Sequence, residues 1–278
     1  MKDLAVLIPS YNDNEALRKT LRSIDEKDNS FTVVVVDDGS PEPVEIDQSE
    51  YLFSIKLIRL PENQGITGAL NAGLRYILDE GFAYIARLDA ADLNRPARLL
   101  TQYQRMKEES DLGMLGSNVV FRDETTHKAL FTTNLPLSSE SLRRRIVFHN
   151  CFIHPSVMIR TAVLKTTGLY DPRHRHIEDF VLFTRITEAT KTANLEQPLV
   201  DCYIREQGIS GKNFRAQMLS GIRFKLQNPR PLDGLWWGAL INRTAKMFFP
   251  PTWRTRIKKA LGFARGCESS ETPAEKPA

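Results

Sequence analysis

The stretch AYIARLDAADLNRPARL, residues 83–99 of this 278-residue chain, contains the clearest combination of a predicted strand with acidic residues at its end. Its apolar beginning predicts a short buried strand, which is followed directly by Asp89 and, three residues later, by Asp92. Arg95–Pro96 then predict the start of a helix, because proline is tolerated in a first helical turn. Open α/β sheets bind their ligands just past the carboxyl ends of strands, and hard cations take carboxylate oxygens. The stretch is compatible with a metal or nucleoside-diphosphate site, but an ordinary polar loop with a helix cap has the same pattern, and this stretch alone does not favour the site.

The residues before this stretch alternate between strand and helix. Apolar runs predict strands over 4–9, 31–36 and 55–60. Apolar spacing over 15–25 and the glycine-containing segment 63–73 predict helices between them. The run FTVVVV is almost entirely β-branched and apolar on both faces, which suits a central parallel strand. This alternation predicts an α/β fold with a parallel sheet.

A second acidic strand end supports a ligand site in this sheet. The run FTVVVV stops at Asp37-Asp38-Gly39-Ser40, a composition that also forms ordinary turns. Because two separate strands deliver carboxylates at their carboxyl ends, we expect Asp38 and Asp89 to share one acidic crevice.

The second half of the chain has a less regular pattern. Predicted strands cover 113–121, 128–136 and 150–160, and predicted helices cover 138–147, a segment from about 161 and a segment from 178. Glu178 and Asp179 stand at the start of the last helix, where acids also complement the helix dipole without any chemistry.

Six motifs in order resemble glycosyltransferase family 2. They are Ile8-Pro9-Ser10-Tyr11-Asn12, Val36-Asp37-Asp38-Gly39-Ser40, Asn63-Gln64-Gly65 with Asn71-Ala72-Gly73, Arg87-Leu88-Asp89-Ala90-Ala91-Asp92 with Arg95-Pro96-Ala97-Arg98-Leu99, His154-Pro155-Ser156-Val157-Met158, and Glu178-Asp179. Each motif alone is weak, but six in order, from Leu4 to about Arg205, are specific. The resemblance implies the GT-A fold over residues 1–228. It also implies inverting transfer of a sugar from a nucleoside-diphosphate donor to a hydroxyl of a glycan or lipid-linked glycan, of the kind used in bacterial surface polysaccharide synthesis.

The resemblance also implies roles for individual residues. The donor, a UDP-, GDP- or dTDP-sugar, would be bound by Pro9, Tyr11, Asn12, Asp38, Gly65, Asn71, Arg87 and Asp89. Asp89 and Asp92 would hold a divalent cation, Mn²⁺ or Mg²⁺, which neutralises a departing diphosphate. Asp179, with Glu178 beside it, would be the base that takes the acceptor proton. His154, His176 and Arg205 would lie on the side of the acceptor or the leaving group.

The chain departs from the family pattern at one position. The family usually reads Asp-x-Asp-Asp, and here Ala91 replaces the second acid, commonly the direct metal ligand. Three interpretations remain open. Asp89 or Asp92 holds the cation with phosphate and water; arginines stabilise the leaving group instead, with Arg87, Arg95 and Arg205 as candidates; or the domain binds a sugar nucleotide without catalysis.

The positive charge of the chain is concentrated near its C-terminus. Seven lysines and arginines face one aspartate between Pro231 and Gly266, although the net charge of the whole chain is only +4. From Trp253 the apolar residues fall on one helical face, so segment 229–266 is expected to be a basic amphipathic helical appendage. It would lie on an anionic membrane surface or pack on the catalytic domain. Residues 267–278 are expected to be disordered.

Composition and the absence of certain motifs disfavour several other classes of protein. The three cysteines are widely spaced and suit a reducing cytoplasm, and no apolar run is long enough for a spanning helix. No G-x-G-x-x-G follows the first strand, which disfavours a dinucleotide-dependent oxidoreductase. The run VVVVDDGS alone resembles a phospho-acceptor signalling domain, but the chain is too long for one. No nucleic-acid-binding module is evident. The expected location is the cytoplasmic face of the inner membrane.

Overall fold

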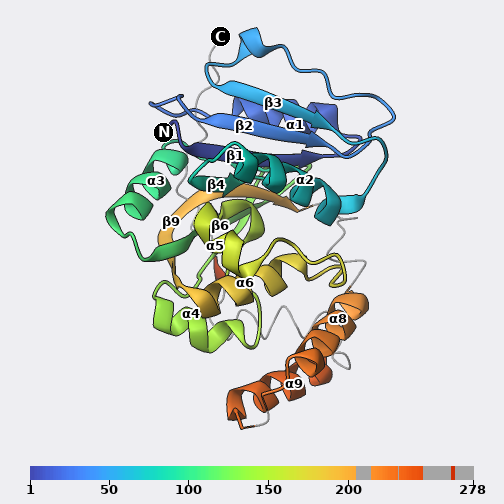
Figure 1. The fold of residues 1–278 in the computed structure, drawn as a ribbon, viewed down its shortest axis with the longest axis vertical. Coiled ribbons are helices and arrows are strands. Elements are labelled where there is room, and N and C mark those ends of the chain that lie inside the picture. Colours follow the sequence, from blue (N-terminus) through green and yellow to red (C-terminus); the bar gives the residue numbers. More distant parts are fainter. Residues whose placement is uncertain (205–213, 231, 247–263, 267–278) are drawn as a thin grey trace.

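A computed structural model describes residues 1–204, 214–230, 232–246 and 264–266. Its N-terminal half contains a parallel sheet in the spatial order β3-β2-β1-β4. The strands are β1 (Leu4–Ser10), β2 (Thr32–Asp37), β3 (Ser54–Arg59) and β4 (Tyr84–Arg87). Helices α1 (Asn14–Arg22) and α2 (Gly65–Asp79) connect them, with the side chain of Asp13 capping α1. The predicted parallel α/β arrangement is therefore present here (Figure 1).

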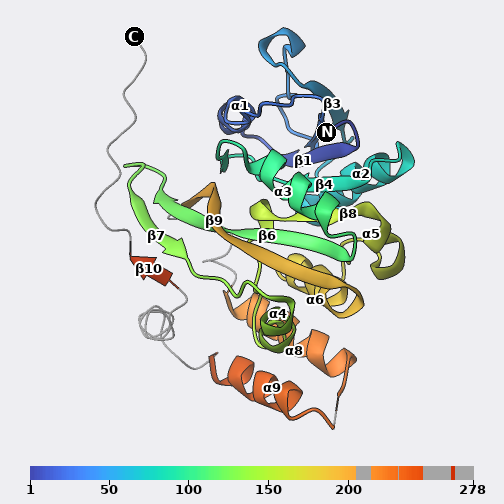
Figure 2. The same cartoon turned by 90° about the vertical axis from the view of Figure 1, so that its left-hand side faces the viewer.

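The sheet continues beyond β4 through antiparallel neighbours. The further strands are β6 (Leu112–Asp123), β7 (Ala129–Thr133), β8 (Met158–Arg160) and β10 (Ala264–Gly266), which complete the order β10-β7-β6-β8-β4-β1-β2-β3. The long strand β9 (Lys191–Ile204), absent from the sequence prediction, runs parallel to β6 and also pairs with the short strand β5 (Leu93–Asn94). Figure 2 shows β10 beside β7 at the edge.

Two predicted boundaries are wrong. The helix expected from Arg95 begins only at Arg98 (α3, Arg98–Glu108), because residues 93–94 pair with β9 and Ala97 has a left-handed φ of 60°. The strand expected over 150–160 is reduced to β8, because a short 3₁₀ helix occupies His154–Ser156.

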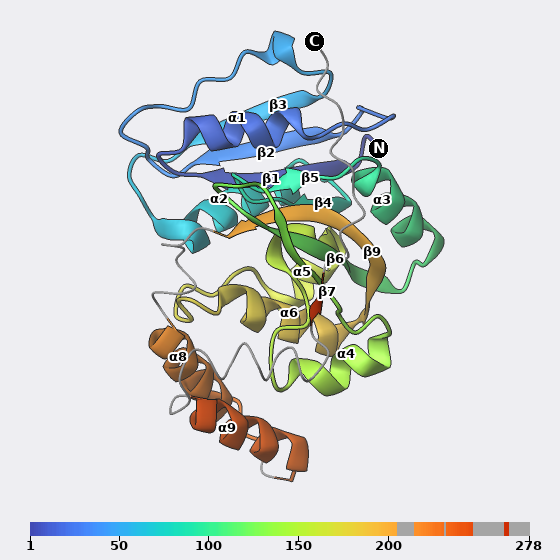
Figure 3. The same ribbon diagram turned by 180° about the vertical axis from the view of Figure 1, so that it is seen from behind.

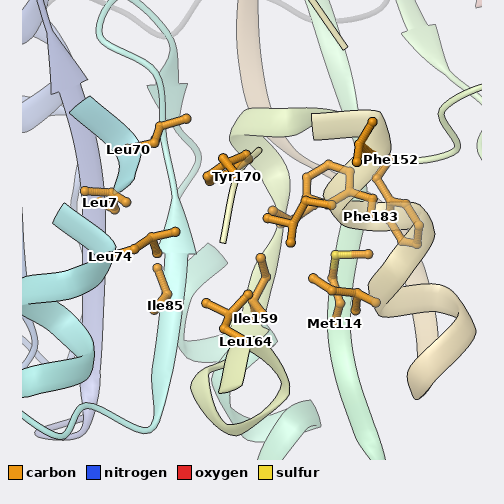
Figure 4. Packing of buried hydrophobic residues seen from close by; sticks show 14 of the residues in the cluster. Leu7, Leu70, Leu74, Ile85, Met114, Phe152, Ile159, Leu164, Tyr170 and Phe183 are labelled. Carbon is orange, nitrogen blue, oxygen red and sulfur yellow. The ribbon is translucent and has the colours of Figure 1, made fainter. Parts of the chain in front are cut away.

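Helices α4 (Ser139–Ile146), α5 (Thr161–Thr167) and α6 (Glu178–Ala189) follow in the second half of the chain. Alternate residues of β1 face opposite sides of the sheet, so two apolar cores form. Leu7 packs with Leu70 and Leu74 of α2 in the core that extends to α5 and α6 (Figure 4). Leu4, Val6 and Ile8 belong to the other core, which includes residues of α1 and α3.

A buried polar network connects α3 to the end of β4. The guanidinium of Arg98 is fully buried and donates to the carbonyl oxygen of Arg87 (2.7 Å) and to the side chains of Gln102 and Asn94. Glu26 accepts the backbone N–H groups of Leu99 and Leu100 at the start of α3. These bonds fix the strand end from which Asp89 emerges.

Helices α8 (Phe214–Gln227) and α9 (Gly234–Lys246) pack against each other near the lower end of the molecule (Figures 1 and 3). The indole Nε1 of Trp236 donates to the carbonyl oxygen of Asn228 across the turn between them (3.1 Å). The expected domain boundary at residue 228 falls in this turn. Within the described ranges, no helix is long and apolar enough to cross a membrane.

The amphipathic helix expected from Trp253 lies mostly outside the described residues. Its predicted C-terminal end does not belong to a helix, because residues 264–266 form β10 against β7. The tail 267–278 also lies outside the described residues.

We predict that Arg98→Met lowers the free energy of unfolding by about 3 kcal/mol, because it leaves Glu26 and three hydrogen-bond acceptors without their buried cation. Urea unfolding followed by circular dichroism measures the effect. Arg18→Met, on the exposed face of α1, is the matched control and should change stability by less than about 0.5 kcal/mol. Equal effects of the two substitutions would contradict a structural role for Arg98.

Candidate active site

A cleft with a volume of about 1360 Å³ lies between the carboxyl end of β4 and the helices of the second half. Its walls come from α2, the segment after β4, residues 148–155, residues 172–180, the end of β9, and helices α8 and α9. The site residues predicted from sequence that line it are Gly65, Asn71, Arg87, Asp89, Asp92, His154, His176, Glu178 and Asp179. Acids from two distant segments therefore meet in one cleft.

Asp89 is the half-buried carboxylate at the end of β4. Burial acts to raise its pKa, but the guanidinium of Arg87, to which it is hydrogen-bonded, holds the pKa below its usual range. Arg87 also donates to the carbonyl oxygen of Leu88. Asp89 is therefore an anion that is oriented by its own strand.

Asp92 is more deeply buried than Asp89 and faces β9. Its Oδ1 accepts the backbone N–H of Tyr203 (3.1 Å), and the Cys202 thiol lies within hydrogen-bonding distance. Burial and, after it, the charge of Asp89 raise the pKa of Asp92 to about 7. The two acids thus differ in protonation near neutral pH.

Ala91, between them, has a strained backbone. Its φ of 87° lies in the left-handed region that favours glycine, and its N–H donates to Oγ1 of Thr20 (2.9 Å). The turn between Asp89 and Asp92 is thereby held against α1.

Asp179 lies in the first turn of α6. Its Oδ2 accepts from the side-chain amide of Asn150 (2.8 Å), and its Oδ1 accepts the backbone N–H of Phe180 (2.7 Å). Burial and the neighbouring charge of Glu178 nevertheless raise its pKa to about 6. A carboxylate with a pKa close to neutrality is suited to proton transfer.

A chain of hydrogen bonds connects α2 to His154. The side-chain amide of Asn71 exchanges two hydrogen bonds with the backbone of Tyr170 (2.8 and 3.1 Å), and the Tyr170 hydroxyl bonds Nε2 of His154 (2.7 Å). Burial and the charge of Arg87 lower the pKa of His154 to about 3, so its ring is neutral. Asn71 and His154 therefore shape the cleft, and their amide and ring nitrogen are engaged within the protein.

The expected nucleoside pocket lies beside the cleft, not in its wall. Pro9 is buried within β1, Tyr11 is half exposed, and Asn12 donates its N–H to Oγ of Ser40. Asp38, 3% exposed, accepts the N–H of Gln64 at the start of α2 (2.8 Å), and burial raises its pKa. These side chains follow β1 and β2 at the same sheet edge as Asp89. Arg205 lies outside the described residues.

Sequence reasoning missed several residues of the cleft. Asn150, which orients Asp179, stood in a segment expected to be a strand. Gln217 and Met218 of α8 and Arg243 of α9 line the cleft from a segment assigned partly to the appendage. The polar and charged residue types were visible, but no spacing linked them to Asp179.

Asp89 and Asp92 are the carboxylates that could bind a divalent cation in this cleft. In the described part of the chain, no cluster of three or more His, Cys, Asp and Glu side chains is placed to hold a metal. The ionised Asp89 and the nearby Asp92 provide two carboxylates on one turn. Mg²⁺ commonly takes one or two carboxylate ligands from a protein when substrate phosphates complete its coordination shell. The residues therefore fit a cation that is shared with a bound diphosphate.

The acids at the strand ends and the α/β sheet define a GT-A type enzyme. The model of the family "Glycosyl transferase family 2" matches residues 5–167, more than half of the chain, so the chain belongs to this family. The protein is a glycosyltransferase, as the resemblance implied.

Known proteins agree with this assignment. The chain is 29% identical to the amylovoran biosynthesis glycosyltransferase AmsE of Erwinia amylovora over 66% of its own length and 68% of that protein. S. aureus TarS 1–349, in complex with UDP-GlcNAc, has a similar fold with a TM-score of 0.61, covering 93% and 79% of the two chains at 18% identity. The mannosyltransferase PcManGT of Pyrobaculum calidifontis, in complex with GDP-Man and Mn²⁺, has a TM-score of 0.58 over 93% and 79% at 16% identity.

We predict that the carboxyl group of Asp179 titrates near pH 6 and that two neighbours move its pKa in opposite directions. Glu178→Gln removes a negative charge and lowers the pKa, whereas Asn150→Ala removes a donor to the carboxylate and raises it. Carboxyl ¹³C NMR measures the titration, and Asp179→Asn assigns the signal. A pKa near 4 that neither substitution moves would contradict this description of the site.

Proposed function

We propose that this protein transfers a sugar from a nucleoside-diphosphate donor to an acceptor hydroxyl with inversion at the anomeric carbon. The observation that carries the proposal is the position of Asp179, on the wall of the same cleft as Asp89, with its pKa raised to about 6. Inversion in a single displacement needs one base on the acceptor side and stabilisation of charge on the leaving diphosphate. The cleft offers both on its two sides.

In this proposal Asp179 accepts the proton of the acceptor hydroxyl as the hydroxyl attacks. Asn150 holds the carboxylate through Oδ2, and the backbone N–H of Phe180 holds Oδ1. The neighbouring charge of Glu178 raises the basicity of Asp179. Asp179 is therefore the catalytic residue, and Glu178 and Asn150 tune and position it.

Asp89 and Arg87 serve the donor side. Asp89, with Asp92 behind it, would hold Mn²⁺ or Mg²⁺, which neutralises charge on the leaving diphosphate when bound. The complexes of TarS with UDP-GlcNAc and of PcManGT with GDP-Man and Mn²⁺ support a nucleotide sugar as the donor class. Pro9, Tyr11, Asn12 and Asp38 would contact the nucleoside next to the cleft. The name of the Erwinia relative supports a role in polysaccharide synthesis.

We predict that Asp179→Asn lowers kcat for glycosyl transfer about 10³-fold, because the variant lacks the base. Binding of UDP or GDP in the presence of Mn²⁺, followed by thermal shift, should stay unchanged, since the donor side is intact. Asp79→Asn, at the exposed end of α2, is the matched control and should retain full activity. Transfer by Asp179→Asn at the wild-type rate would rule out this mechanism.

We further propose that α8 and α9 contact an anionic membrane surface, at the cytoplasmic face of the inner membrane. The outward residues Leu235, Trp237 and Ile241 of α9 are 47%, 48% and 66% exposed. On α8 the exposed side chains of Arg215, Leu219, Arg223 and Leu226 alternate between basic and apolar along one face. The only acid in the described residues from 214 to 246 is Asp233. Basic side chains and exposed apolar groups together favour an anionic lipid interface.

We predict that Trp237→Ser combined with Ile241→Ser weakens binding to phosphatidylglycerol–phosphatidylcholine vesicles about tenfold or more, because each side chain loses apolar contact with lipid. Vesicle sedimentation measures the binding. Leu52→Ser, at a side chain that is 88% exposed before β3, removes a similar apolar group elsewhere and should have no effect. Unchanged binding of the double variant would exclude this face.

A further inference from the structure

We propose that Arg243 binds an anionic group of the acceptor, a phosphate or diphosphate ester, beside the catalytic base. The inference rests on the proposed function, since it takes Asp179 to be the base. Arg243 is in α9, 7% exposed, and it lines the cleft that contains Asp89 and Asp179. Its guanidinium lies 4.8 Å from the centre of the Phe180 ring, and Phe180 directly follows Asp179. Stacking on a ring face leaves the N–H groups at the edge of the guanidinium free to donate.

Arg243 and Lys225 are two buried cations that lie close to each other. Among the residues that the structure describes, no carboxylate forms an ion pair with Arg243. Lys225 of α8 is also buried, 5% exposed, and makes no such pair with a described residue either. Burial and then the charge of Arg243 lower the pKa of Lys225 to about 8, although the carboxylates of Asp233 and Glu188 act in the opposite direction. Burying two neighbouring cations is unfavourable, and Arg243 has no ion pair of its own among the described residues, so an anionic ligand at Arg243 would lower this cost.

Helix α8 leaves room for this guanidinium. A Cβ atom on Gly221 would lie 1.3 Å from Nη1 of Arg243. Glycine in a helix interior is less favourable than alanine, so its presence at the crossing of α8 and α9 has a local cost. A glycine at position 221, despite its lower helix propensity, is explained if the guanidinium of Arg243 must occupy this position in order to bind a ligand.

The position of Arg243 assigns the anion to the acceptor. The donor diphosphate is placed at Asp89 and Arg87, after β4, whereas Arg243 contacts α6 next to Asp179. The acceptor hydroxyl must come within hydrogen-bond distance of that base. A charged group held by Arg243 therefore belongs to the molecule that carries this hydroxyl. The exposed apolar face of the same helix is consistent with an acceptor that is linked to a lipid through phosphate.

The test uses the tryptophan fluorescence of the whole protein. The three tryptophans are Trp236, Trp237 and Trp253, all in the C-terminal segment. We expect farnesyl diphosphate, below its micelle concentration, to change this fluorescence, and Arg243→Gln to weaken its binding about tenfold or more. Gly221→Ala, which keeps the charge but displaces it, should also weaken binding. Arg18→Gln, at an exposed arginine of α1, is the matched control and should bind like the wild type.

Further ligands identify the source of the anion. Inorganic pyrophosphate should compete with farnesyl diphosphate in the wild type, and farnesol should bind the wild type and Arg243→Gln equally. Equal affinity of both proteins for farnesyl diphosphate, with Arg243→Gln folded by circular dichroism, would overturn the proposal. A matching loss of UDP or GDP binding in Arg243→Gln would overturn it too, because the arginine would then serve the donor. The fluorescence experiment measures ligand binding and does not require sugar transfer. Its result therefore tests the role of Arg243 separately from the proposed reaction, which the Asp179→Asn variant tests.

Discussion

The buried guanidinium of Arg98 holds together the segments that carry the site. It fixes the carbonyl oxygen at the end of β4 and the side chain of Gln102 in α3. Gln102 in turn donates to the carbonyl oxygens of Leu115 in β6 and Ser156 in the 3₁₀ helix (3.0 and 2.9 Å). A cation without water is stable only when hydrogen bonds surround it. The strand end with Asp89 and the segment with His154 are therefore fixed relative to each other by one network.

The two sides of the cleft come from different halves of the chain, and a second set of bonds joins them. The side-chain amide of Asn71 on α2 forms two hydrogen bonds with the backbone of Tyr170, and the hydroxyl of Tyr170 forms a hydrogen bond with the ring of His154. This connection fixes the segment that leads into α6 and hence Asp179. The neutral ring of His154 adds no charge to the cleft that Asp89 and Asp179 also line.

The sequence predicted the parallel strands and the acids at their ends, because β-branched runs and strand-end carboxylates are local signals. It did not predict β9, because Glu196, Gln197 and Pro198 interrupt the alternation of apolar and polar residues in this strand and its partner β6 lies about eighty residues earlier. No local sequence pattern identified Asn150, because its hydrogen bond to Asp179 forms only when α6 packs next to it. Arg243 was recognised only as part of a basic segment. Contacts between distant segments decide these positions, and spacing along the chain does not encode them.

The loss of an acid at Ala91 is best understood from the charges of the whole cleft. Four arginines line it, and Arg87 is the one that forms an ion pair, with Asp89; no described carboxylate pairs with Arg75, Arg175 or Arg243. On the acidic side, burial and then the charge of Asp89 raise the pKa of Asp92 to about 7, so Asp92 is partly protonated at neutral pH, whereas Asp179, with a pKa of about 6, is mostly ionised there. A diphosphate entering the cleft thus meets three arginines with which no described carboxylate forms an ion pair. In the proposed reaction these arginines would share the stabilisation of the leaving diphosphate with a bound cation, which gives a physical reason for an alanine at position 91.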